Sequence, residues 1–125
     1  MTQTTADLGS LTRAFYTEVD ANDADVFHRR FAATAAFRFN DLEPVVGPEA
    51  ITSFVRAWKA NFRSLAHDLE RVTVDRDEGR VGTEILVTYV FPDGREVKVH
   101  GSSFLDYTDG LITGWRVYVD KSALA

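Results

Sequence analysis

Two side chains in the sequence have the chemistry of a proton-transfer site. Asp120 ends the alternating segment 115–120 and would act as a general acid or base if helices shielded it, because desolvation raises the pKa of a carboxylic acid. His67 precedes Asp68, and a histidine–aspartate pair can carry a proton to or from an enolisable carbon. Both have ordinary alternatives: Asp120 can cap the turn after its strand, and His67 can be a surface residue beside Asp68.

A small-molecule pocket would need an apolar wall and a few polar groups around Asp120 and His67. Tyr118 shares the face of Asp120, because alternate residues of a strand point the same way. Tyr16 can point its phenol inward from a helix, and Trp58 is expected in the core or in the pocket wall. The predicted ligand-binding residues are Tyr16, Trp58, Leu86, Thr88, Ser103, Arg116 and Tyr118.

Composition disfavours other kinds of site. The chain has no cysteine, and its 3 histidines do not cluster, so we predict no metal site and no cofactor. His28 and His100 are expected at a surface or an interface. A net charge of −5 argues against nucleic acid, whose phosphates need a basic protein surface. Without a signal-peptide pattern or an apolar run of roughly 20 residues, we expect a soluble, cytoplasmic protein.

Periodicity predicts helices in the first half of the chain and strands in the second. The expected helices are 5–21, a short one that begins after Asp23, and one that begins at Pro48, with a short strand at 35–40 before the last. The expected later strands are 69–76, 81–91, 95–107 and 111–120. This order indicates an α+β fold, with helices on one face of an antiparallel sheet, in a single domain over residues 1–125.

Hairpin turns at Asp93-Gly94 and Asp109-Gly110 set the expected register of these strands. If both loops have two residues, the rows Glu84–Ser103–Arg116, Leu86–Gly101–Tyr118 and Thr88–Val99–Asp120 share the pocket face. The other face then exposes Phe104, Trp115, Val117 and Val119, and an apolar patch of this kind predicts a homodimer. A three-residue loop with a glycine bulge at Asp109-Gly110 would slip the register by one residue and move each side chain to the opposite face.

The whole pattern resembles the NTF2-like superfamily, specifically its SnoaL-like branch. The matching landmarks are Phe15-Tyr16 before Asp20-Ala21-Asn22-Asp23, then Phe31-Ala32, Gly47-Pro48-Glu49-Ala50-Ile51, and Asp109-Gly110-Leu111-Ile112 leading to Tyr118-Val119-Asp120. The resemblance implies an α+β cone of three N-terminal helices on a curved antiparallel sheet. It also implies a pocket for a small hydrophobic molecule and dimerisation through the sheet. SnoaL-type cyclases have an acidic residue at the end of the last strand, matching Asp120, and related members have a histidine near His67.

The resemblance leaves the reaction open. A ketosteroid isomerase uses a tyrosine and two aspartates, and alignment places these at Phe15, Phe39 and Ser103, so that mechanism is disfavoured. One hypothesis is a cofactor-independent acid–base enzyme of cyclase, isomerase or dehydratase type, acting on a polyketide-, steroid- or terpenoid-like substrate. The alternative is a non-catalytic ligand-binding or dimerisation domain. Exposure of Asp120 and His67 to bulk solvent would count against the enzyme.

Overall fold

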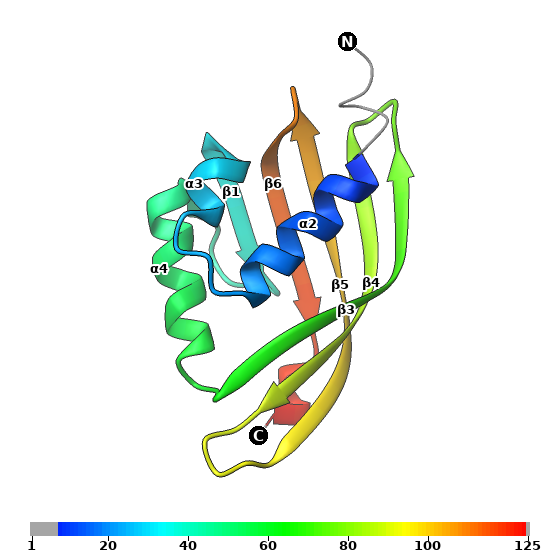
Figure 1. The fold of residues 1–125 in the computed structure, drawn as a ribbon. Helices are drawn as coiled ribbons and strands as arrows, with labels where there is room; N and C mark the ends of the chain where they lie inside the picture. Colours follow the sequence, from blue (N-terminus) through cyan, green and yellow to red (C-terminus); the bar gives the residue numbers. More distant parts are fainter. Residues whose placement is uncertain (1–7, 125) are drawn as a thin grey trace.

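A computed structural model describes residues 8–124 as three α-helices beside a six-stranded sheet (Figure 1). The helices are α2 (Leu8–Asp20), α3 (Val26–Arg30) and α4 (Pro48–Lys59), and a 3-10 helix, η1 (Lys121–Leu124), follows the last strand. The strands are β1 (Phe31–Phe39), β2 (Val45–Val46), β3 (Ser64–Asp75), β4 (Arg80–Val90), β5 (Glu96–Thr108) and β6 (Leu111–Val119). The expected start of the first helix at residue 5 lies outside the described residues.

Local sequence explains the two longer helices. α2 buries Leu8, Thr12, Phe15, Tyr16 and Val19, whose spacing of three and four residues makes one helical face. The chain enters α4 through Gly47, whose φ of 94° suits glycine, and proline then occupies the first helical turn. α2 presents this face to the sheet, and α4 presents the face that carries its buried residue, Ile51.

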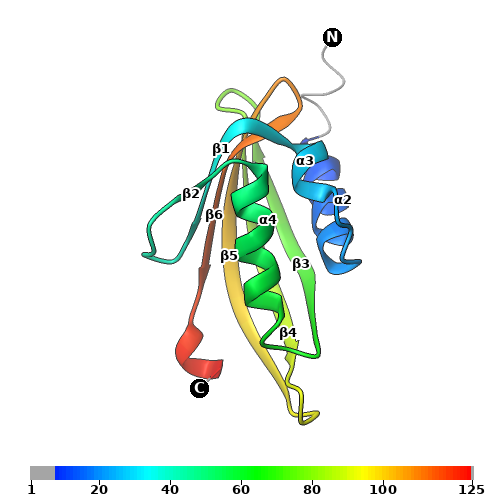
Figure 2. The ribbon, with the colours of Figure 1, turned by 90° about the vertical axis from the view of Figure 1, so that its left-hand side faces the viewer.

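The strands run in the order β2-β1-β6-β5-β4-β3. All neighbouring pairs are antiparallel except β1 and β6, which run parallel. α2 crosses one face of the curved sheet, and α4 lies on the same side (Figures 1 and 2). The α+β prediction is therefore confirmed. The three helices are not one N-terminal block, however, because β1 and β2 separate α3 from α4.

The predicted register of β4 and β5 is wrong by one residue. Val90 pairs with Glu96, and the Phe91 amide donates to the Arg95 carbonyl at 2.8 Å, which leaves a three-residue loop at 92–94. Pro92 has no amide hydrogen for the ladder, and Gly94 takes the positive φ (92°) of a glycine-bulge loop. Each β4 side chain is consequently on the face opposite to the one expected.

The register of β5 and β6 is correct at the turn and then slips. Asp109 and Gly110 both have positive φ, and Thr108 pairs with Leu111 across a two-residue loop as predicted. Beyond the next pair, Asp106 faces Gly114, so one extra residue of β6 bulges out.

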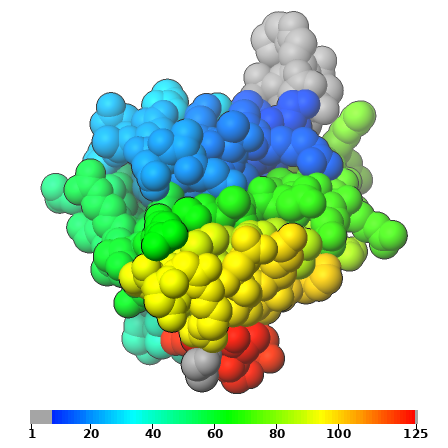
Figure 3. Space-filling view, turned by 60° about the horizontal axis from the view of Figure 1, so that its bottom comes forward, coloured from blue at the N-terminus to red at the C-terminus, as the bar shows by residue number. Residues whose placement is uncertain are grey.

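The two slips determine what faces the helices. The concave face carries the rows Thr83–Ser103–Val117 and Ile85–Gly101–Val119, while Glu84–Ser102–Tyr118 lies on the outer face. Trp115 (4 % exposed) and Val119 (9 %) are thus core residues, and of the predicted exposed patch Phe104 alone is at the surface. Figure 3 shows the end of the molecule where the β4–β5 hairpin and η1 come forward. No helix among the described residues has the length and apolar character to cross a membrane.

Candidate functional site

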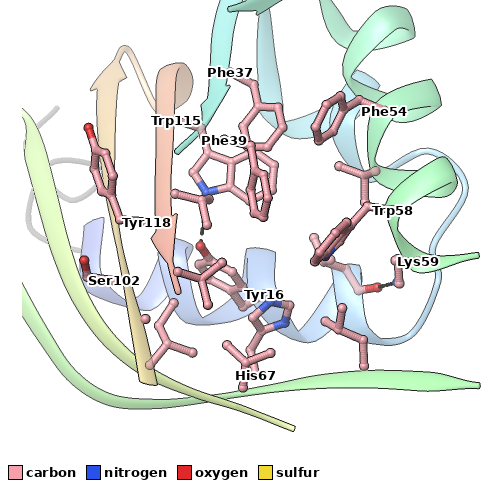
Figure 4. A pocket seen from close by; sticks show the side chains of 18 of the residues that line it. Tyr16, Phe37, Phe39, Phe54, Trp58, Lys59, His67, Ser102, Trp115 and Tyr118 are labelled. Atoms are coloured by element: carbon pink, nitrogen blue, oxygen red, sulfur yellow. Dashed lines mark hydrogen bonds between the residues drawn. The ribbon is translucent and has the colours of Figure 1, made fainter. Parts of the chain in front are cut away.

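A cavity of about 60 Å³ lies between the concave face of the sheet and helices α2 and α4 (Figure 4). Its wall is mainly aromatic and aliphatic. Trp115 packs against Phe37 with ring centroids 4.4 Å apart, and Trp58 packs against Phe39 at 5.0 Å. Further side chains of the wall are Val19, Phe54, Val55, Leu65, Ile85, Val87 and Tyr89. Gly101 of β5 also lines the cavity, and it packs closely against Tyr118 and Val119 of β6.

Three polar side chains reach this apolar cavity from different elements: His67 from β3, Tyr16 from α2 and Lys59 from α4. A few polar groups in an apolar wall are typical of a small-molecule site.

His67 is held by Asp20, the last residue of α2. The imidazole Nδ1 lies 2.6 Å from Asp20 Oδ1, and the backbone amide of His67 donates to Asp20 Oδ2 at 2.8 Å. β3 is an edge strand, so this amide is free of the sheet ladder and available to the carboxylate. Since a carboxylate can only accept a hydrogen bond, neutral His67 carries its proton on Nδ1, which donates to Asp20. Nε2 is then the basic nitrogen.

Asp68 is not the partner of His67. Successive residues of a strand point to opposite faces, and Asp68 is exposed on the outer side of β3. Asp20 lies 47 residues from His67, and the end of α2 brings it there. The only local signal for this position is that Asp20 falls where the helical pattern ends.

Tyr16 belongs to a buried hydrogen-bond network. Its hydroxyl donates to Ser103 Oγ at 2.8 Å and accepts from Trp115 Nε1 at 3.0 Å, and Ser103 Oγ lies 2.7 Å from Thr83 Oγ1. Burial raises the pKa of Tyr16 to about 12, so the phenol stays protonated at neutral pH. Its ring lies 4.9 Å from the His67 ring, centroid to centroid, and forms one side of the imidazole's surroundings.

Lys59 closes the site at the ends of two helices. It lies in the last turn of α4, and its Nζ donates to the Val19 carbonyl near the end of α2 at 2.6 Å. Burial lowers the pKa of this ammonium group, and the negative charge of Asp20 opposes that effect. Sequence reasoning missed Lys59, because only the convergence of α2 and α4 brings it to the cavity.

The structure brings together part of the predicted ligand-binding set and one of the two predicted catalytic residues, His67. Tyr16, Trp58 and His67 line the cavity, and Ser103 is fully buried behind it in contact with Tyr16. The register slips place the other four predicted side chains on the outer face of the sheet: Leu86, Thr88, Arg116 and Tyr118. The β6 strand borders the cavity at Tyr118, but the phenol points away from it (Figure 4).

Asp120 is not shielded by helices, so the condition for its acid–base role is not met, and the alternative, a carboxylate that caps the turn after its strand, is what the structure shows. Its carboxylate is exposed beyond the end of β6 and accepts hydrogen bonds from the Ser122 hydroxyl at 2.6 Å and the Ser122 amide at 3.0 Å. These bonds hold the pKa of Asp120 below its usual value, the opposite of the predicted desolvation effect. Asp120 and His67 do not share the cavity, so any proton chemistry there has to rest on His67.

The remaining histidines are at the surface, as the sequence suggested. His28 is exposed on α3, and His100 is exposed on the outer sheet face, 3.2 Å from Glu70. Residues 8–124 contain no group of three side chains placed to hold a metal ion.

The SnoaL-like domain family matches residues 12–115. This chain belongs to that family. A proposed SnoaL-like polyketide cyclase from Jannaschia sp. CCS1 is 22% identical, with a TM-score of 0.85 over 95% of this chain and 89% of that one. A proposed polyketide cyclase from Xanthomonas campestris pv. campestris is 22% identical, with a TM-score of 0.83 over 98% and 96%.

The fold of this SnoaL-like domain also occurs with other chemistry. An LEH-like epoxide hydrolase from M. tuberculosis is 17% identical, with a TM-score of 0.79 over 94% of this chain and 86% of that one. No curated protein matches the chain. At these identities the similarity establishes the fold, while the reaction has to be argued from the cavity itself.

Proposed function

We propose that this SnoaL-like domain binds a small hydrophobic molecule in its cavity and transfers a proton on it, with His67 as the acid–base group. The observation that carries the proposal is the His67–Asp20 pair at the wall of an aromatic cavity. A histidine–aspartate pair that served only stability would not need to border a cavity.

The geometry supports a defined sequence of proton movements. Asp20 fixes the Nδ1–H tautomer, so Nε2 removes a proton from a carbon beside a carbonyl group and the electron pair moves to the carbonyl oxygen. The imidazolium that results is stabilised by the Asp20 carboxylate. Return of the proton to another carbon gives isomerisation, and attack of the enolate carbon on a second carbonyl gives cyclisation. Tyr16 remains a neutral wall residue throughout, because its pKa is about 12.

Ring-containing substrates of polyketide, steroid or terpenoid type suit the aromatic wall, and the polyketide cyclases among the structural neighbours favour the same class. The cavity of about 60 Å³ is smaller than the ~150 Å³ that holds a benzene molecule in an engineered protein core. A substrate of this class therefore requires side chains at the wall, such as Trp58 and Lys59, to move outward on binding.

Hydrogen–deuterium exchange of 2-indanone, followed by proton NMR in D₂O, tests this function. We expect the protein to accelerate exchange at the carbons beside the carbonyl, and His67→Gln to lower the catalysed rate by about 100-fold or more. Asp20→Asn should also lower it, because the correct tautomer is no longer enforced. His28→Gln, which changes an exposed histidine, is the matched control and should retain the full rate.

Non-catalytic binding is the alternative that the narrow cavity favours. Exchange no faster than in buffer, together with 2-indanone-induced shifts of cavity resonances, would replace the proton-transfer proposal with this one.

We also propose that the domain forms a homodimer through the outer face of its sheet. The main support is the arrangement of α2, α3 and α4, which all lie on the other side (Figures 1 and 2). On the outer face, Phe104 is 39% exposed and its ring lies 6.3 Å from that of Tyr118. A cytoplasmic location and a single domain over residues 1–125 stay predictions from the sequence.

A further inference from the structure

Lys59 is a charged side chain at the cavity, and its contacts in the structure use only part of its hydrogen-bonding capacity. Its ammonium group has three hydrogens, and the Val19 carbonyl accepts one of them. No Asp or Glu of residues 8–124 lies within 4.0 Å of Lys59 Nζ as an ion-pair partner. A half-buried cation without an ion-pair partner is stabilised when an anion binds beside it.

The charge at the cavity wall is positive. The residues that line the cavity, all within the described part of the chain, include no Asp or Glu, while Lys59 is among them. The carboxylate of Asp20 acts on Lys59, but both of its oxygens are bonded to His67, at 2.6 and 2.8 Å, and Asp20 does not line the cavity. A bound molecule therefore meets the ammonium group of Lys59 and the imidazole of His67 rather than a carboxylate.

A second hollow, of about 340 Å³, adjoins the cavity at the same lysine. It lies between the end of α2, α3 and α4, and shares Val19, Val55 and Lys59 with the cavity wall. The Lys59–Val19 hydrogen bond thus stands between a narrow apolar cavity and a wider space. Asp23 also lines this hollow, but its carboxylate is paired with Arg29 at 2.7 Å. A ligand too large for the cavity can extend into this space if the lysine side chain turns toward the ligand.

We propose that Lys59 makes the site selective for acidic ligands, in which a carboxylate pairs with its ammonium group while an apolar body occupies the aromatic cavity. This inference rests on ligand binding in the cavity, as in the proposed function, but not on proton transfer. It defines the substrate class more closely, as hydrophobic acids rather than neutral hydrocarbons or alcohols. Lys59 also caps the end of α2, and that role alone would affect stability without any preference for acids.

The affinities of benzoate and benzamide, which have nearly the same shape and differ in charge, test the proposal. Binding is measured by NMR titration at low ionic strength, with the wild-type protein and three variants. We expect the wild type to bind benzoate about five- to tenfold more tightly than benzamide, since hydrogen bonds to a charged partner are the stronger ones. Lys59→Met should abolish this preference and change the benzamide affinity by less than about twofold. Lys59→Arg, which keeps the charge, should preserve it.

Lys98→Met is the matched control, because it removes the same charge from an exposed position on the outer side of β5. It should leave the preference for benzoate unchanged, which separates a local pair from the effect of net charge. The proposal would be overturned if the wild type bound benzoate no better than benzamide, or bound neither. It would also be overturned if Lys59→Met kept the preference for benzoate, or lost affinity for both ligands equally. The 2-indanone exchange experiment remains independent of all these outcomes, so failure of one does not decide the other.

Discussion

At the scale of single residues, the Tyr16 hydroxyl is the group on which the buried polar network depends. It connects Trp115 to Ser103, and Tyr16 is 2% exposed, so water cannot replace it. Tyr16→Phe would leave the Trp115 indole without its acceptor and should cost about 1–3 kcal/mol of unfolding free energy. Urea denaturation measures this loss, with Tyr118→Phe on the outer face as the control, expected within about 0.5 kcal/mol of wild type. Equal effects of the two variants would contradict the assigned network.

The same tyrosine predicts how stability changes in alkaline solution. Burial raises the pKa of Tyr16 to about 12, against 10.0 in an unfolded chain. Between these values the unfolded state has lost the proton and the folded state keeps it, so stability is complete below pH 10 and falls as the pH rises toward 12. In this range the ionisation of Tyr16 lowers the free energy of unfolding by up to about 1.4 kcal/mol per pH unit. Urea midpoints at several pH values above 9 should therefore fall less steeply in Tyr16→Phe; identical slopes would reject the predicted shift.

The sequence identified those site residues that a local sequence pattern or their own chemistry marks. Tyr16 and Trp58 follow helical periodicity, and His67 has a chemistry that draws attention wherever it lies. Asp20 and Lys59 act at the cavity because α2 and α4 end beside each other, with the Lys59 ammonium 2.6 Å from the Val19 carbonyl. Sequence spacing carries no information on such a contact between two helix ends.

At the scale of elements, the limits of the last three strands were predictable and the pairing was not. β1 and β3 begin at Phe31 and Ser64, earlier than the expected residues 35 and 69. The bounds expected for β4, β5 and β6 are within one residue of those observed, since turn residues mark them. Pairing failed on either side of β5, at Pro92 and at the bulge opposite Asp106, where one residue changes the face of a whole strand. Both errors moved polar residues of β4 and β6 into a predicted pocket, where the structure instead has aliphatic residues of these strands, such as Ile85, Val117 and Val119.

Two glycines in different elements should respond oppositely to the same substitution. A Cβ at Gly101, in the central strand β5, would lie 2.9 Å from the Tyr118 carbonyl oxygen, so Gly101→Ala should cost about 1–3 kcal/mol. A Cβ at Gly9, in α2, would meet Val74 and Val72 at ordinary distances of 3.6 and 3.7 Å. Gly9→Ala should therefore stabilise the protein by about 0.5–1 kcal/mol through the higher helix propensity of alanine.

Thermal and urea unfolding of both variants check this pair. A destabilised Gly9→Ala, or a neutral Gly101→Ala, would show that the strand or the helix adjusts its backbone more easily than the contacts imply.

At the scale of the whole molecule, the layers decide which surfaces remain for a partner. The helices and the concave face of the sheet enclose the aromatic core and the cavity, while the outer face of the sheet carries side chains from all the long strands. An antiparallel sheet can stay solvated on one face, and charged pairs such as Arg80–Asp106–Arg116 suit that state. The Phe104 ring, in contrast, is a large apolar group at this surface. It covers Gly82 of β4, where a side chain's Cβ would lie 3.2 Å from the ring.

The homodimer prediction follows from this outer face and is tested by the mass in solution. Two copies related by a two-fold axis would bring their Phe104 and Tyr118 rings together, because such an interface uses the same patch on both chains. Size-exclusion chromatography with light scattering should give twice the 14.0 kDa of one chain. Phe104→Glu should shift the mass toward one chain, because a carboxylate at the interface would be desolvated and face its own copy. Leu42→Glu changes an exposed leucine between β1 and β2 in the same way and should leave the dimer intact. A wild-type mass of 14.0 kDa, or a dimer that survives Phe104→Glu, would exclude this face as the interface.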